Sequence, residues 1–158
     1  MAGSTNKKVL IERFDRAPLA GYVTPQVYLT PDGVDLLSPS GTAQVVPYEE
    51  VKAVCFVRDF DGADPSREPK IFNTRPKMEG LWVRLRFRDG ELREGLLPNN
   101  LLQLEPQGFT YLPPNPTNNQ RVFVPKTALA EVQILGVVGS PLRPRKTKPV
   151  PKEQIELF

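Results

Sequence analysis

The chain repeats one pattern of residues, and this internal duplication limits its possible folds more than any other feature. Residues 9–57 and 82–136 carry the same anchors in the same order, although few residues are identical. The matched anchors are Phe14 with Phe87, Gly21 with Gly95, Gly33 with Gly108, Pro47 with Pro125, Val51 with Leu129, and Val54 with Val132. Such a repeat is one small structural unit used twice. Because a copy of about fifty residues is marginal as an independent core, we expect the copies to pack together.

The second copy shows the clearest strand pattern. Apolar and basic residues alternate along residues 82–88, which predicts a strand with one buried face. The apolar set is Val83, Leu85 and Phe87, and the basic set is Arg84, Arg86 and Arg88. Asp89-Gly90 is a strong hairpin signal. The segments ELREGLL, GFTYL, RVFVP and AEVQILGVV predict four more strands, with a single helical turn at KTAL, and the first copy has PYEEV in that place.

Proline and glycine punctuation between many short strands indicates an all-β protein. The chain has 158 residues, and its 18 prolines are about twice the usual share. We expect a first five-stranded barrel over residues 8–58, a connecting segment over 59–80 and a second barrel over 81–139. Residues 140–158 are predicted to form a disordered, basic, proline-rich tail, because they combine five Lys/Arg with repeated prolines.

The second copy resembles the Sm-like barrels, the family of the bacterial RNA chaperone Hfq. The resemblance rests on VRLRFRDGELREGLL, which is similar to the opening hairpin, and on RVFVPKTALAEVQIL, which is similar to the closing strands. It implies two fused Sm/SH3-like barrels. The family's N-terminal helix has no counterpart, and Lys126 stands nearest to its RNA-contacting histidine. The resemblance therefore implies the fold. It does not imply the ring of single barrels that the family forms, and it does not imply the family's RNA site.

A second small barrel, the cyclic-dinucleotide-binding PilZ domain, is an alternative reading. Arg84 and Arg88 have the spacing of its arginine element, but they follow the serine element that should come after them. That serine element, residues 36–41, also begins with Leu36, where an acid or amide belongs.

Composition argues against an enzyme. The chain has no histidine, which removes the commonest general base and metal ligand. Its one cysteine, Cys55, lies in the apolar run AVCFV and is interpreted as a small buried hydrophobe. Asp59 and Asp61 lack the other oxygen ligands of a calcium loop. We predict no catalytic residue, no metal and no cofactor.

Charge and hydropathy bear on partners and location. The net charge of +3 resides in residues 140–158, and the other residues balance at 16 basic and 16 acidic side chains. No segment has the run of about 18 apolar residues that a membrane span needs, and the N-terminus has no apolar signal-peptide core. We therefore expect a cytoplasmic protein that does not enter membranes, with its oligomeric state left open.

Three segments are candidate binding sites. Arg84, Arg86 and Arg88, with Trp82 on the same strand face and Lys126 nearby, suggest phosphate and base contacts; the alternative is a solvated face paired with Glu91 and Glu94.

The last residues, Gln154, Ile155, Glu156, Leu157 and Phe158, are similar to the peptide that binds the bacterial sliding clamp, and they suggest a docked tail; the alternative is that they fold back. The third segment is residues 113–120, whose Asn118, Asn119 and Gln120 suggest ligand contacts or an ordinary turn.

The sequence thus favours a non-enzymatic binding or adaptor protein that acts through protein contacts. RNA or single-stranded nucleic-acid binding by the barrel surface is the alternative. A core without net charge argues against specific nucleic-acid recognition.

Overall fold

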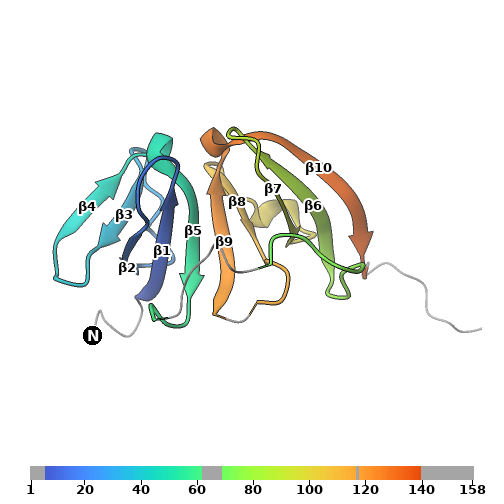
Figure 1. Cartoon of the computed structure of the whole chain (residues 1–158), viewed down its shortest axis with the longest axis horizontal. Helices are drawn as coiled ribbons and strands as arrows, with labels where there is room; N and C mark the ends of the chain where they lie inside the picture. Colours follow the sequence, from blue (N-terminus) through green and yellow to red (C-terminus); the bar gives the residue numbers. More distant parts are fainter. Residues whose placement is uncertain (1–5, 62–68, 117, 140–158) are drawn as a thin grey trace, which may run out of the picture.

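The computed structural model describes residues 6–61, 69–116 and 118–139, and all its regular elements are strands or single 3₁₀ turns (Figure 1). The first half contains β1 (Lys7–Arg13), β2 (Leu19–Val23), β3 (Val34–Leu37), β4 (Ala43–Val46), η2 (Tyr48–Glu50) and β5 (Val51–Val57). The second half contains β6 (Gly80–Phe87), β7 (Leu92–Leu97), η4 (Leu101–Gln103), β8 (Gly108–Tyr111), β9 (Asn119–Pro125), η5 (Lys126–Ala128) and β10 (Leu129–Val138). The all-β prediction is confirmed. In the described part of the chain, no helix is long and apolar enough to cross a membrane.

The strands form two antiparallel sheets. The larger sheet has the order β4-β3-β2-β1-β5-β9-β8, and the smaller one has the order β10-β6-β7. Leu96 of β7 and Leu112, just after β8, join the two sheets through a single bridge with a hydrogen bond in each direction. Each half therefore has its strands in the order fourth, third, second, first, fifth, with a 3₁₀ turn before the fifth. The order is the expected consequence of the duplication.

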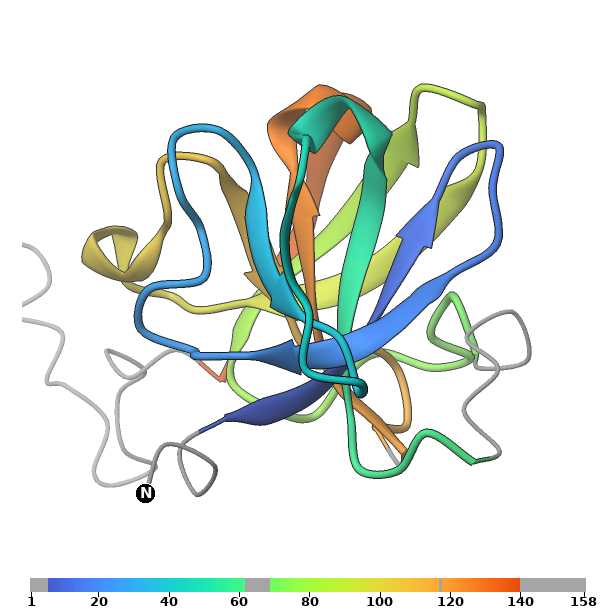
Figure 2. The ribbon, with the colours of Figure 1, turned by 90° about the vertical axis from the view of Figure 1, so that its left-hand side faces the viewer.

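Neither sheet closes on itself, so the two closed barrels predicted from the sequence are not found. The fifth strand of the first half, β5, uses its second edge to pair with β9 of the other half. In the second half, pairing between β7 and β8 stops at the Leu96–Leu112 bridge, because Pro98, Pro113 and Pro114 on either side of it have no N–H to donate. The strands instead form an arc that runs from β4 at one end to β10 at the other (Figure 1), and Figure 2 shows the molecule from the β4 end.

The paired glycines mark equivalent close approaches in the two halves. A Cβ on Gly21 would lie 2.6 Å from the Leu37 carbonyl oxygen, and one on Gly95 would lie 2.1 Å from the Tyr111 ring. In both cases the second strand crosses closely over the third. A Cβ on Gly33 or Gly108 would meet the carbonyl oxygen just before Pro47 or Pro125, at 2.2 and 2.1 Å. These sites need glycine because a neighbouring strand occupies the side-chain position.

The two halves share their buried cores, as expected. One apolar cluster combines the second half with Leu10 of β1 and with Ala53, Cys55 and Val57 of β5. The other cluster belongs to the first half but includes Phe123 of β9, whose ring packs edge-on against Tyr28. In β6, Val83, Leu85 and Phe87 are fully buried, as the alternating pattern predicted.

Candidate binding site

A buried ion pair fixes the two halves against each other at one end of the junction. The guanidinium of Arg93 on β7 is 4% exposed and donates to both carboxylate oxygens of Glu12 on β1, at 2.8 and 3.2 Å. Arg93 also pairs with Glu91 and lies over the Phe87 ring. Lys52 of β5 extends the network and contacts Asp89 and Glu91 of the β6–β7 hairpin. All its charges are paired, so this cluster is structural.

Titration behaviour agrees with tight pairing. Burial lowers the pKa of Lys52, but hydrogen bonds to Asp89 and Glu91 outweigh it and hold that pKa above its ordinary value. Burial raises the pKa values of Asp89 and Glu91, but hydrogen bonds outweigh it and hold both pKa values below their ordinary values. The main donor is Lys52 for Asp89, and it is Arg93, followed by Lys52, for Glu91. Burial and the nearby Glu12 carboxylate raise the pKa of the Cys55 thiol well above its usual range, which disfavours the thiolate form.

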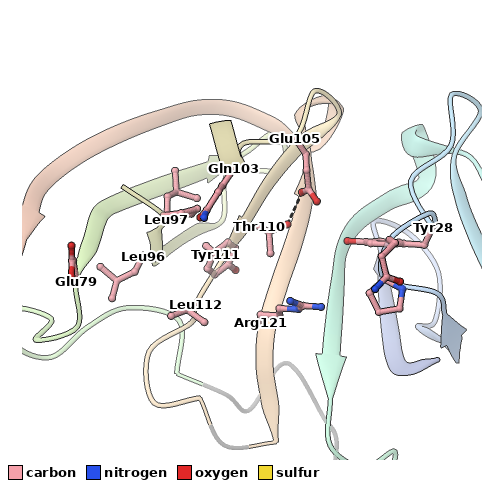
Figure 3. Close-up of a pocket in the computed structure, with 13 residues that line it drawn as sticks. Tyr28, Glu79, Leu96, Leu97, Gln103, Glu105, Thr110, Tyr111, Leu112 and Arg121 are labelled. Atoms are coloured by element: carbon pink, nitrogen blue, oxygen red, sulfur yellow. Dashed lines mark hydrogen bonds between the residues drawn. The ribbon is translucent and has the colours of Figure 1, made fainter. Parts of the chain in front are cut away.

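A cavity lies where β7 and β8 separate, and we call it the seam cavity (Figure 3). Its volume is about 420 Å³. One wall comes from the first half, through Pro25, Gln26 and Tyr28 in the loop between β2 and β3. The opposite wall belongs to the second half and includes Leu96 and Leu97. The cavity therefore exists only because the two halves meet.

Polar groups surround an apolar floor in the seam cavity. Glu105 accepts a hydrogen bond from the Thr110 hydroxyl at 2.7 Å (Figure 3), and Arg121 lies over the Phe56 ring. Gln26, Gln103 and Glu79 also contribute polar groups to the lining. This arrangement of apolar surface with a few placed polar groups is typical of binding pockets.

Exposed apolar side chains flank the seam cavity. Val27 lies between the lining residues Gln26 and Tyr28, and its side chain is exposed. Leu101 and Leu102 precede the lining residue Gln103 in η4, and Leu102 is 94% exposed. Large apolar residues grouped around a cavity indicate a docking surface more strongly than scattered ones do.

A second cavity, of about 340 Å³, lies under the connecting segment. Pro69 and residues 71–78 form one side of it, and prolines 113, 114 and 116 contribute to the other. The segment packs on both strands of the β6–β7 hairpin: the Glu94 amide of β7 donates to the Lys70 carbonyl at 2.7 Å, and the Phe72 ring meets Trp82 of β6 edge-on. The described part of the connecting segment is thus an ordered wall of this cavity.

The predicted arginine face is largely occupied by contacts within the chain. Arg84 lies 3.7 Å from Glu94, and Arg86 lies 3.1 Å from Glu131. Arg88 donates to the backbone carbonyls of Thr127 and Glu49 and stacks over the Phe14 ring. These contacts favour the alternative of a solvated, paired face.

Trp82 and Lys126 do not extend that face into a free stacking surface. The Trp82 indole donates to Glu94 at 3.1 Å, and Arg75 lies over its ring. Lys126 is exposed at the start of η5. The candidate tail residues Gln154, Ile155, Leu157 and Phe158 lie outside the described residues.

Two asparagines of the third candidate segment, Asn118 and Asn119, make contacts that support the fold. Both side-chain atoms of Asn118 bind the backbone of Asp59, at 2.8 and 3.1 Å, and so hold the start of the connecting segment. Asn119 is buried opposite Val57 in the β5–β9 ladder. The Asp59 carboxylate lies 3.7 Å from Lys8. Across residues 6–61, 69–116 and 118–139, no group of acidic, histidine or cysteine side chains is placed to hold a metal.

Sequence reasoning missed the seam cavity, because its lining comes from segments far apart in the chain. Tyr28, Glu105 and Arg121 lie on three different elements, and no local motif connects them. One usable signal was present: Pro98 and the Pro113-Pro114 pair flank the second and third strands of the second copy, where they limit strand pairing.

A family model covers most of this fold. Residues 5–136 match the family of unknown function DUF6982, and the chain belongs to this family. No curated protein and no solved structure matches the chain.

Proposed function

We propose that this chain is a non-enzymatic binding protein that holds an extended peptide segment of a partner protein in the seam cavity. The observation that carries the proposal is the opening between β7 and β8, which has an apolar floor, polar edges and exposed leucines beside it. An extended peptide places alternate side chains on one side, and such side chains fit a row of apolar pockets.

The charged residues that line the seam cavity indicate which peptides would bind there. Glu79 and Glu105 line the cavity with a single arginine, Arg121, so its lining carries one more negative charge than positive. We infer a peptide with an apolar side chain in the cavity and a lysine or arginine next to it. The leucines of η4 would contact the peptide where it leaves the cavity.

This proposal is preferred to RNA or single-stranded nucleic-acid binding and to a PilZ-like function. Both alternatives require free arginines, and Arg84, Arg86 and Arg88 already contact carboxylates, carbonyls or an aromatic ring. Guanidiniums with partners in the fold must exchange those contacts for phosphate, which reduces the net gain. The two cavities involve none of the three.

The test is selection of peptides from a random display library, followed by fluorescence anisotropy on the selected sequences. We expect enrichment of peptides that alternate apolar residues and include a basic one. The variants Gln103→Trp, which places a bulky ring at the cavity wall, and Leu102→Asp should weaken binding at least about tenfold. Ile134→Asp, on an exposed strand edge outside the cavity, is the matched control and should bind as the unmodified chain does.

Two results would count against the proposal. One is a library that yields no peptide with saturable binding. The other is a selected peptide whose affinity is unchanged by both cavity variants. If single-stranded RNA binds instead and an Arg84, Arg86 and Arg88 triple charge reversal abolishes that binding, the nucleic-acid alternative replaces the proposal.

A further inference from the structure

The contact between the two halves is a strand junction that has an unused counterpart at the ends of the arc. Within the chain, the fifth strand of the first half pairs with the fourth strand of the second half. The equivalent strands at the ends are β10, the fifth of the second half, and β4, the fourth of the first half. Each terminates a sheet, and Figure 1 shows them at opposite ends of the molecule.

We propose that β10 of one molecule pairs with β4 of a second copy, and that this pairing repeats the internal β5–β9 junction. The partner is therefore another molecule of this chain, joined head to tail. The inference does not depend on the proposed function, because neither edge lines the seam cavity.

The internal junction predicts the register of the new one. In the β5–β9 ladder, Val54 pairs with Phe123, Cys55 with Val122, and Phe56 with Arg121. The duplication offset of 78 residues, set by Pro47 with Pro125 and by Val54 with Val132, converts these pairs into their equivalents. The predicted pairs are Val132 with Val45, Gln133 with Gln44, and Ile134 with Ala43 of the second copy.

The side chains at these positions suit such pairing. Ile134 is 65% exposed and Val45 is 49% exposed, although both are large β-branched residues. No charged residue occurs in β4 or in residues 132–138 of β10. Edge strands that avoid pairing usually carry lysine, proline or a bulge. The register of β10 against β6 shifts at Leu129/Glu131 and at Ile134/Gly136, and residues 132–134 keep a regular register between these two irregularities. Here Glu131 pairs with Arg86 and Arg75 binds the Val137 carbonyl, which leaves residues 132–134 between them.

The new junction is expected to be weaker than the internal one. The Glu12–Arg93 ion pair has no equivalent in it, because the strand register places Arg86 and the uncharged Leu19 at the corresponding positions. A heterologous junction of this kind produces a ring if the rotation between molecules closes and a filament if it does not. Self-association should therefore depend on concentration.

Sedimentation velocity on the full chain from about 1 µM to about 1 mM tests the proposal. We expect the weight-average mass to rise with concentration. Val45→Lys, which alters the β4 edge, and Ile134→Lys, which alters the β10 edge, should each give monomers. An equimolar mixture of the two variants should give dimers, because the first supplies an intact β10 and the second an intact β4. That recovery also shows that both variants are folded.

Other outcomes identify other arrangements and overturn the proposal. A chain that stays monomeric throughout refutes it. Loss of association in only one edge variant indicates pairing of like edges. Association that survives in both edge variants but is lost in Leu102→Lys assigns the contact to the seam, and association lost only on removal of residues 140–158 assigns it to the tail.

The register has its own test. Chains carrying Gln44→Cys and Gln133→Cys are mixed with oxidised glutathione as oxidant. The predicted directly opposed pair brings the two Cα atoms within the distance that a disulfide spans. We expect a cross-linked dimer from this mixture and little from the control mixture of Gln44→Cys with Leu102→Cys. Equal cross-linking in the two mixtures contradicts the register.

Discussion

Two strands at equivalent positions in the repeat, β5 and β10, have opposite surroundings. In β5, six of seven residues are buried, because β1 covers one edge and β9 the other. In β10, only Val138 of ten residues is buried, because β6 covers one edge and the described residues leave the other open. The difference comes from position in the arc. A repeated unit therefore has one central copy and one terminal copy of the same strand, and within the described residues the terminal copy is paired on one edge only.

The largest expected change in stability comes from a substitution that removes the Glu12–Arg93 ion pair, which is specific to the internal junction. Glu12→Ala should lower the free energy of unfolding by about 3–5 kcal/mol, because it leaves the buried Arg93 guanidinium without its main partner. Chemical denaturation measures this change. The double variant Glu12→Leu with Arg93→Met should recover much of the loss. A loss below about 1 kcal/mol for Glu12→Ala would mean that the pair does not fix the two halves.

The comparison of the two strands is tested most directly at Phe56 and Ile134, which are equivalent positions. Phe56→Ala should cost about 3–5 kcal/mol because the ring packs against Tyr28 in the core. Ile134→Ala should change the stability of the monomer by less than about 0.5 kcal/mol. Thermal denaturation at low protein concentration measures the loss of stability in each of the two variants. Similar costs at the two positions would contradict the central and terminal assignments.

An intermediate effect is expected where strands cross closely. Gly95→Ala places a methyl group against the Tyr111 ring and should cost about 1–3 kcal/mol by overpacking. Gly136→Ala is the matched control in β10, because its nearest neighbours lie at ordinary contact distances of 3.5 Å and beyond. Equal urea midpoints for the two variants would show that the close approach at Gly95 does not constrain the fold.

The smallest effect concerns pH. Because the pKa values of Asp89 and Glu91 are lowered on folding, their contribution to stability is complete above their ordinary pKa values of 3.8 and 4.5. It is lost as the pH falls through the lowered values. Replacing Lys52 with Met should flatten the stability profile below about pH 5, by less than about 1 kcal/mol because the hairpin is partly solvated. Denaturation curves at several acidic pH values measure how the free energy of unfolding depends on pH. If the Lys52 contacts contribute nothing, that dependence is the same in the variant and in the unmodified chain.

The sequence by itself determined the repeating unit. Alternation along residues 82–88 predicted the buried face of β6, and KTAL and PYEEV predicted the turns that became η5 and η2. The paired glycines and prolines marked the strand crossings, because backbone geometry restricts those residue types locally. The short turn η4 was not predicted, since LLQ carries no strong helical signal beyond its Asn100 cap.

Tertiary structure alone decided how the two units meet. Strand pairing across the junction depends on contacts between residues about 70 positions apart, such as Val54 with Phe123, and no local pattern distinguishes this arrangement from two separately closed barrels. The same contacts bring Tyr28, Glu105 and Arg121 around one cavity and leave β4 and β10 at the ends. Local propensity fixes which segments become strands, whereas the choice of edge partners depends on the packing of the whole chain.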